Sequence, residues 1–173
     1  MIVGIFWRPQ SVRHLTRIAF LSAIGIALYV VESLVPSPAP FLKIGLANVS
    51  SVLALMTLSA SDVVLVVATR VVVGSLIVGT LFSPSFVIAL GSGLAAAAAM
   101  WVARAAGKMF SVVGVSLVGS VTHVVTQLLL VMFLFVRDSS LLILLPLLLL
   151  SALAGGLIVG FISLKLLGVL EKS

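Results

Sequence analysis

Six long apolar runs, separated by short breaks, constrain the fold of this chain more than any other feature of its sequence. The runs cover residues 15–35, 44–60, 63–82, 86–106, 112–136 and 140–170. A helix needs about 20 predominantly apolar residues to cross the hydrocarbon core of a bilayer. Because 62% of the residues are hydrophobic and 8% are charged, no polar stretch is long enough to build a soluble domain. The sequence therefore predicts an all-α polytopic membrane protein, a bundle of six transmembrane helices.

Turn-forming and helix-breaking residues mark the junctions between these runs. They are found at residues 36–40, 59–62, 83–85, 107–108 and 137–140. The run 44–60 is near the lower length limit for a span, so irregular or re-entrant backbone is expected around residues 41–45. The run 140–170 exceeds one crossing, and Pro146 is expected to kink or break it. Residues 15–170 are thus predicted to form a single six-helix domain, preceded by a cytoplasmic or interfacial segment, 1–14.

The basic residues set the expected orientation of the bundle. With the N-terminus in the cytoplasm, the inner side carries Arg8, Arg13, Arg17, Arg104, Lys108, Lys165 and Lys172. The outer side then carries only Lys43 and Arg137. This positive-inside bias predicts a multi-pass protein of the cell membrane with both termini in the cytoplasm. It also accounts for the formal charge of +6, so no nucleic-acid partner is expected.

The first run carries a stripe of small residues, Ala19, Ala23 and Ala27, spaced four apart. Residues four apart lie one above the other on a helix face. In lipid, small residues let two helices approach closely, and this is a main route of helix recognition. The stripe is therefore a candidate partner-binding surface, although packing inside the bundle is a further interpretation.

The few polar side chains within the runs are candidate substrate-binding residues, because an ionisable group costs about 3 kcal/mol at the bilayer centre. They are Glu32, Lys43, Asn48, Arg70, His123 and Gln127. At about 1.5 Å of rise per residue, all except Arg70 fall in the outer half of the membrane, where they would line a pocket. Arg70 is expected deeper, about a third of the way from the cytoplasmic side.

Each of these residues also has a structural interpretation. Lys43 would extend to the lipid head groups, and Glu32 would lie at the interface or pair with Lys43. His123 would be a hydrogen-bonded interior histidine, while Asn48 and Gln127 would link helices. Arg70 is the hardest to explain without function, because a guanidinium so deep needs an anion, carbonyl groups or water.

Signatures of catalysis and of cofactor binding are absent from the sequence. It contains no nucleotide-binding loop, zinc signature or serine elbow, and it has no cysteine. His123 is accompanied by neither a second histidine nor a ligand-spaced carboxylate, so no metal site is predicted. The aspartates, Asp62 and Asp138, stand alone at helix ends, whereas a prenyl diphosphate synthase needs aspartate clusters to hold magnesium. We therefore predict a non-enzymatic protein without a cofactor.

The six spans and the alanine stripe resemble the substrate-binding S component of an energy-coupling factor (ECF) transporter. More narrowly, Lys43–Asn48 together with Thr69–Ser75 resembles the Gx transporter family, which is also labelled heptaprenyl diphosphate synthase component I. The resemblance implies that Ala19, Ala23 and Ala27 face a transmembrane T subunit, which joins a pair of cytoplasmic ATPases. It also implies that the outer pocket binds a small vitamin-like molecule, and for this branch a flavin-related one.

The sequence thus favours a substrate-binding subunit of an ECF-type transporter, and Arg70 and Lys43 favour an anionic substrate. Two alternatives stay open. The chain could be a membrane accessory subunit for isoprenoid (heptaprenyl) diphosphate synthesis, or a self-contained channel or small transporter formed by oligomerisation. The direction of transport is not specified by the sequence.

Overall fold

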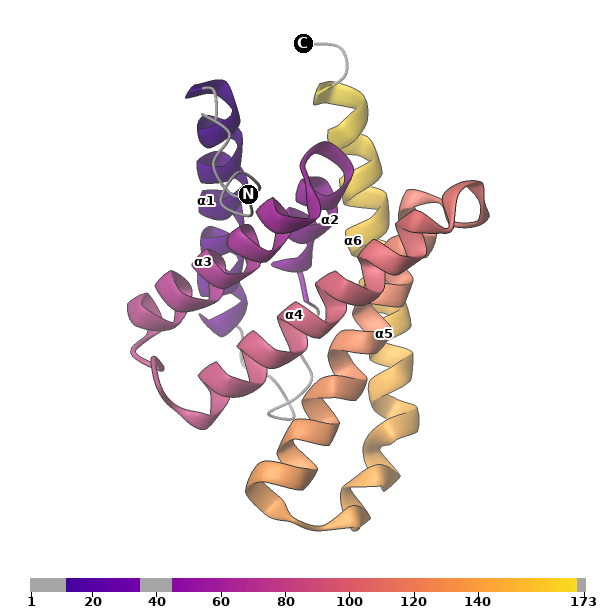
Figure 1. The fold of residues 1–173 in the computed structure, drawn as a ribbon. Helices are drawn as coiled ribbons and strands as arrows, with labels where there is room; N and C mark the ends of the chain where they lie inside the picture. The colour runs from indigo at the N-terminus through magenta and orange to yellow at the C-terminus, as the bar shows by residue number, and fades with distance from the viewer. Residues whose placement is uncertain (1–11, 35–44, 171–173) are drawn as a thin grey trace, which may run out of the picture.

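The computed structural model describes residues 12–34 and 45–170, and its described part is an all-α bundle without a strand (Figure 1). The α-helices are α1 (Val12–Leu34), α2 (Asn48–Thr57), α3 (Ala60–Val78), α4 (Pro84–Ala105), α5 (Val112–Leu130) and α6 (Leu145–Leu170). In this part of the chain, 5 helical segments are long and apolar enough to cross a membrane. The prediction of an all-α polytopic membrane bundle is confirmed.

The helix α2 is much shorter than the apolar run 44–60 that contains it. Its 10 residues rise about 15 Å, half the thickness of the hydrocarbon core. The turn before it uses Gly45 at φ 75°, a left-handed conformation that favours glycine. Every residue from 48 to 55 is buried. A helix that is apolar and buried all round packs against protein, so α2 lies inside the bundle, and residues 41–44 lie outside the described ranges.

The junction between α5 and α6 shows how Pro146 is accommodated. A π-helical turn, Val131–Val136, ends α5, and a 3₁₀ helix, Ser139–Leu144, precedes α6. The long run 140–170 therefore divides at Leu145, where α6 begins. Pro146 is the second residue of α6, a position where the missing N–H group costs nothing because no intrahelical partner exists for it.

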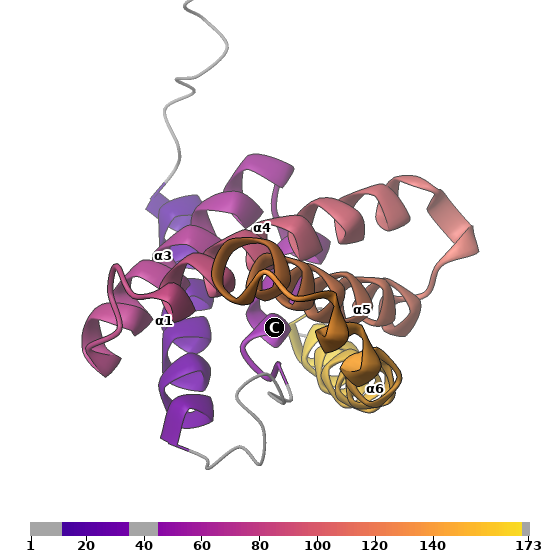
Figure 2. The same cartoon turned by 90° about the horizontal axis from the view of Figure 1, so that it is seen from below.

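The long helices form a layered arrangement around α2. α4 packs between α3 and α5, α1 packs on α3, and α6 packs on α5. Figure 2 shows the same order, with α1 and α3 at one side and α5 and α6 at the other. The main hydrophobic core gathers buried residues from all six α-helices, including Val52 of α2. A separate cluster, centred on Val124 and Leu148, joins α5 to α6.

The bundle has two distinct ends (Figure 1). We call the end where α1 begins and α6 finishes the terminal end. We call the opposite end, where α1 finishes and where α3 turns into α4 and α5 into α6, the cavity end. Both chain-terminal helices reach the same end of the bundle (Figure 1). The number of membrane crossings, and which side of a membrane each end faces, stay predictions.

Candidate functional site

A cavity of about 310 Å³ lies between five helices toward the cavity end of the bundle. This volume is at the lower limit for small-molecule sites in proteins. The lining residues come from α1 to α5 and from the turns before α2 and α4. They are Tyr29, Glu32, Ser33, Gly45, Ala47, Asn48, Arg70, Val71, Val78, Thr80, Pro84, Ser85, Ile88, Ala89, His123 and Gln127.

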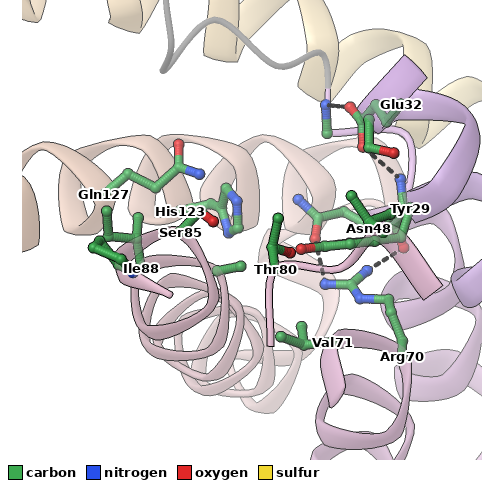
Figure 3. Close-up of a pocket in the computed structure, with 16 residues that line it drawn as sticks. Tyr29, Glu32, Asn48, Arg70, Val71, Thr80, Ser85, Ile88, His123 and Gln127 are labelled. Carbon is green, nitrogen blue, oxygen red and sulfur yellow. Dashed lines mark hydrogen bonds between the residues drawn. The ribbon is translucent and has the colours of Figure 1, made fainter. Parts of the chain in front are cut away.

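The cavity brings together the candidate residues that the sequence distributes over 96 positions (Figure 3). Glu32, Asn48, Arg70, His123 and Gln127 all line it. Lys43 lies outside the described residues. Arg70 was expected to lie deeper in the membrane than the other candidates. Because α3 crosses the bundle obliquely (Figure 1), the middle of this helix, which carries Arg70, meets the start of α2 beside the cavity. That these side chains bind a ligand stays a prediction.

Arg70 is the most unusual member of the set, because its guanidinium is buried. The residue is 2% exposed. Its Nη1 donates to the carbonyl oxygen of Ala47, and its Nη2 donates to Oδ1 of Asn48 at 3.1 Å. Within the described ranges, Nε has no hydrogen-bond partner, and no carboxylate oxygen lies within 4.0 Å of the guanidinium. A buried charge without a close counter-charge is costly, so an anion or a strong acceptor in the cavity would be stabilised there.

Glu32 holds the start of α2 rather than pairing with Arg70 at close range. Its carboxylate accepts hydrogen bonds from the backbone N–H groups of Gly45, of Leu46 at 3.0 Å and of Ala47 at 3.5 Å. These N–H groups have no partner within the helix, and the positive end of the helix dipole favours a carboxylate there. The sequence left an interfacial role or a pair with Lys43 open, and neither interpretation included these backbone partners.

His123 and Gln127 form the facing wall of the cavity. They are four residues apart, so they lie on one face of α5, and both are partly buried. Figure 3 shows them on one side of the cavity, with Arg70 and Glu32 on the other. An imidazole and an amide can each donate and accept hydrogen bonds. The cavity therefore combines a buried cation with two groups that can orient a polar molecule.

Tyr29 is a lining residue that the sequence did not single out. Its hydroxyl and Oγ of Ser75 are 3.0 Å apart and share a hydrogen bond in which either group can donate. The ring packs over Gly74, where an added Cβ would lie 2.5 Å from Cδ1 of Tyr29. The sequence signals that could have pointed to Tyr29 are Gly74 in α3 and the fact that the chain has a single tyrosine. Thr80 and Ser85 were also not predicted as site residues, because Thr80 lies in the turn between α3 and α4 and Ser85 lies at the start of α4.

A comparison with known families assigns the chain. The model of the family described as heptaprenyl diphosphate synthase component I matches residues 21–166. The chain belongs to this family. No curated protein and no solved structure matches the chain.

The region that matches the family model contains every residue that lines the cavity. The first nine residues of α1 lie before this region. In the described ranges, no three histidine or acidic side chains gather as a metal site would require. Asp62 lies in the first turn of α3 and Asp138 precedes the 3₁₀ helix at the other end of the bundle. The polar side chains that line the cavity offer a ligand charge and hydrogen bonds.

Two glycines provide the space that the side chain of Arg70 occupies in this chain. An added Cβ at Gly25 of α1 would lie 2.5 Å from Oγ of Ser50 and 3.0 Å from Cδ of Arg70. At Gly93 of α4, an added Cβ would lie 3.1 Å from Cγ1 of Val67 and 3.6 Å from Nη2 of Arg70. The close approach of α1, α2 and α4 around the guanidinium thus depends on small residues.

Gly25→Ala is expected to destabilise the protein by about 1–3 kcal/mol, because the new methyl group overpacks the contact between α1, Ser50 and Arg70. Thermal unfolding in detergent measures the effect. Gly168→Ala in α6 is the matched control, because an added Cβ there meets nothing within 4 Å. Alanine has the higher helix propensity, so the control should be as stable as the wild type or slightly more so. Equal melting of both variants would contradict the packing described here.

Proposed function

We propose that this chain is the substrate-binding membrane subunit, the S component, of an ECF-type transporter. In this proposal it carries a small vitamin-like molecule, anionic or flavin-related, across the cytoplasmic membrane, and both termini lie in the cytoplasm. The observation that carries the proposal is the buried guanidinium of Arg70 in the wall of a cavity, without a carboxylate within 4.0 Å in the described part of the chain. A group that costs so much in a membrane is expected to serve a ligand.

The charge of the cavity refines the choice of substrate. Glu32 and Arg70 have opposite formal charges, and the carboxylate of Glu32 is engaged by backbone N–H groups. Its charge is therefore partly compensated by the start of α2, while the hydrogen-bond acceptors of the Arg70 guanidinium are neutral oxygens. This difference favours an acceptor or anionic group beside Arg70, with His123 and Gln127 orienting the rest of the molecule.

The surface of α1 supports the choice of partner. Ala19, Ala23 and Ala27 are all exposed, whereas the buried residues of α1 are Ile18, Leu21, Ser22 and Gly25. The alanine stripe is therefore not used for packing within the bundle. An exposed stripe of small residues is suited to close contact with another membrane helix. In the proposal, this helix belongs to a transmembrane T subunit, which joins a pair of cytoplasmic ATPases.

The description of the family favours a second candidate function. Heptaprenyl diphosphate synthase component I names a part of an enzyme, so the chain would be a membrane accessory subunit in isoprenoid diphosphate synthesis. That candidate predicts stable co-purification with a soluble prenyl synthase and a higher activity of that enzyme. In both candidates the chain itself is not the catalyst.

Mass spectrometry of small molecules released from the purified protein tests the first proposal. A flavin or another vitamin-like compound, bound by the wild-type protein, is the expected result. A released prenyl diphosphate would favour the second candidate. A protein that is empty and also fails to bind a panel of vitamins would overturn the substrate-binding proposal, and the polar residues would then be links between helices.

A further inference from the structure

A second pocket lies at the terminal end of the bundle, far from the cavity. It has a volume of about 410 Å³ and is lined by Arg13, His14, Arg17, Thr57, Leu58 and Ser59. Arg17 and Glu32 are 15 positions apart on α1, which places the pocket about 22 Å along the helix from Glu32 in the wall of the cavity. We propose that this pocket, the basic pocket, binds the phosphate head group of an anionic phospholipid.

The charge of the basic pocket favours an anion. Arg13 and Arg17 are four residues apart, so their guanidinium groups share one face of α1. Both residues are exposed, and within the described ranges neither has a carboxylate within 4.0 Å. Guanidinium groups bind phosphate oxygens through pairs of parallel hydrogen bonds. Two of them on one wall provide a site for a phosphate group.

Asp62, an acidic residue that contacts His14 of the basic pocket, is already engaged by other groups. Asp62 is 4% exposed. Its Oδ2 accepts hydrogen bonds from Oγ of Ser59 at 2.5 Å and from N of Ser59 at 3.1 Å, and it lies 3.3 Å from Nε2 of His14. These contacts form the capping box of α3 and tie α1 to its first turn. The carboxylate is therefore held away from the two arginines, whose charge stays available to an external anion.

The surroundings identify the source of the phosphate as a lipid. On the other side of the turn between α2 and α3, Trp101 and Arg104 line a further pocket, and Leu58 contributes to both pockets. Trp101 and Arg104 are exposed. Tryptophan and basic residues of membrane proteins are enriched at the level of the lipid head groups. Phe20, three residues after Arg17 and on the same face of α1, is 58% exposed. An apolar side chain on this face, further from the start of α1 than the two arginines, suits the acyl chains of the same lipid.

Lipid binding to the purified full-length protein tests the proposal. Native mass spectrometry in a neutral detergent compares phosphatidylglycerol with phosphatidylcholine. Each basic residue near an anionic membrane surface contributes about a fivefold preference. We expect Arg17→Gln to weaken phosphatidylglycerol binding about fivefold and Arg13→Gln/Arg17→Gln about 25-fold, without a change for phosphatidylcholine. Arg137→Asn, which removes one exposed positive charge at the cavity end, is the matched control and should bind phosphatidylglycerol as the wild type does.

Three results would overturn the proposal. Equal binding of both lipids by the wild-type protein would exclude head-group recognition. An equal loss in Arg17→Gln and Arg137→Asn would mean that total charge, rather than this pocket, attracts the lipid. Displacement of phosphatidylglycerol from the wild-type protein by inorganic phosphate alone, at constant ionic strength, would assign the pocket to a free phosphate. The displacement measurement uses only the wild-type protein, so it can still contradict the proposal if the double variant does not fold.

Discussion

If the cavity binds a small molecule, as proposed, Arg70→Met is expected to lower the affinity of the protein for this ligand about a hundredfold. Removing one charged partner from a buried, hydrogen-bonded contact costs about 3 kcal/mol, and each 1.4 kcal/mol is a factor of ten in affinity. Methionine has a similar length and fills irregular apolar space without a charge. Riboflavin is the first probe, and isothermal titration of the purified protein gives the dissociation constant.

The stability of the ligand-free protein should respond in a different way. Arg70→Met leaves the carbonyl of Ala47 and Oδ1 of Asn48 without their donor, but it also removes a buried charge that no close carboxylate compensates. Replacing buried charged groups by apolar ones of similar volume is often neutral or stabilising. We therefore expect the free energy of unfolding to change by less than about 2 kcal/mol. A large loss of binding with a small change in stability is the signature of a binding residue.

Glu32→Gln is the matched control for this experiment, since it also removes one charge from the cavity. The amide keeps one oxygen that can accept from the backbone N–H groups at the start of α2. Its effect on affinity should stay below tenfold, because the carboxylate is directed at the backbone rather than at the ligand. If Arg70→Met binds riboflavin and the rest of a vitamin panel as the wild type does, Arg70 only links α3 to α2.

The sequence predicted the bundle because the length of an apolar run is a direct physical requirement of the bilayer. It did not predict that α2 is a short helix inside the bundle. A buried helix and a membrane span are both apolar on all sides, so the run 44–60 is compatible with either. What limits α2 to Asn48–Thr57 is the turn at Gly45 and the extended residue Leu58, and neither is encoded in the average hydropathy of the run.

The candidate site could be predicted in part, because polar groups inside a membrane are rare enough to be considered one by one. That reasoning found Arg70, Asn48 and His123, all of which line the cavity. It missed Tyr29, because a tyrosine in an apolar helix does not stand out. It also missed the partners of Glu32, because they are backbone N–H groups, which every residue except proline carries and which no sequence pattern distinguishes.

Ala23→Trp is expected to abolish co-purification with a T subunit and its ATPases, if the chain is an S component. Ala23 is the middle residue of the exposed stripe on α1, so a large side chain there would hold a partner helix away. Overpacking by so large a group costs about 3 kcal/mol or more, which corresponds to at least a hundredfold loss of affinity. Affinity purification of the tagged chain, co-expressed with the other subunits, measures the association.

The control for this variant is Leu150→Trp on α6, where a 67% exposed apolar side chain also faces outward. Both variants place tryptophan on the outer surface of the bundle, so both should melt like the wild type and bind ligand equally well. Loss of the complex in Ala23→Trp alone would assign the stripe to a partner helix. An intact complex with both variants would mean that the alanine stripe faces lipid. A wild-type chain that does not bind the T subunit and the ATPases, but co-purifies with a prenyl synthase, would favour the second candidate function. Arg70 is buried in the wall of the cavity, whereas Ala23 is exposed on the outside of α1. If the chain is an S component, we therefore expect Arg70→Met to lose ligand binding but to keep assembly, and Ala23→Trp to lose assembly but to keep ligand binding.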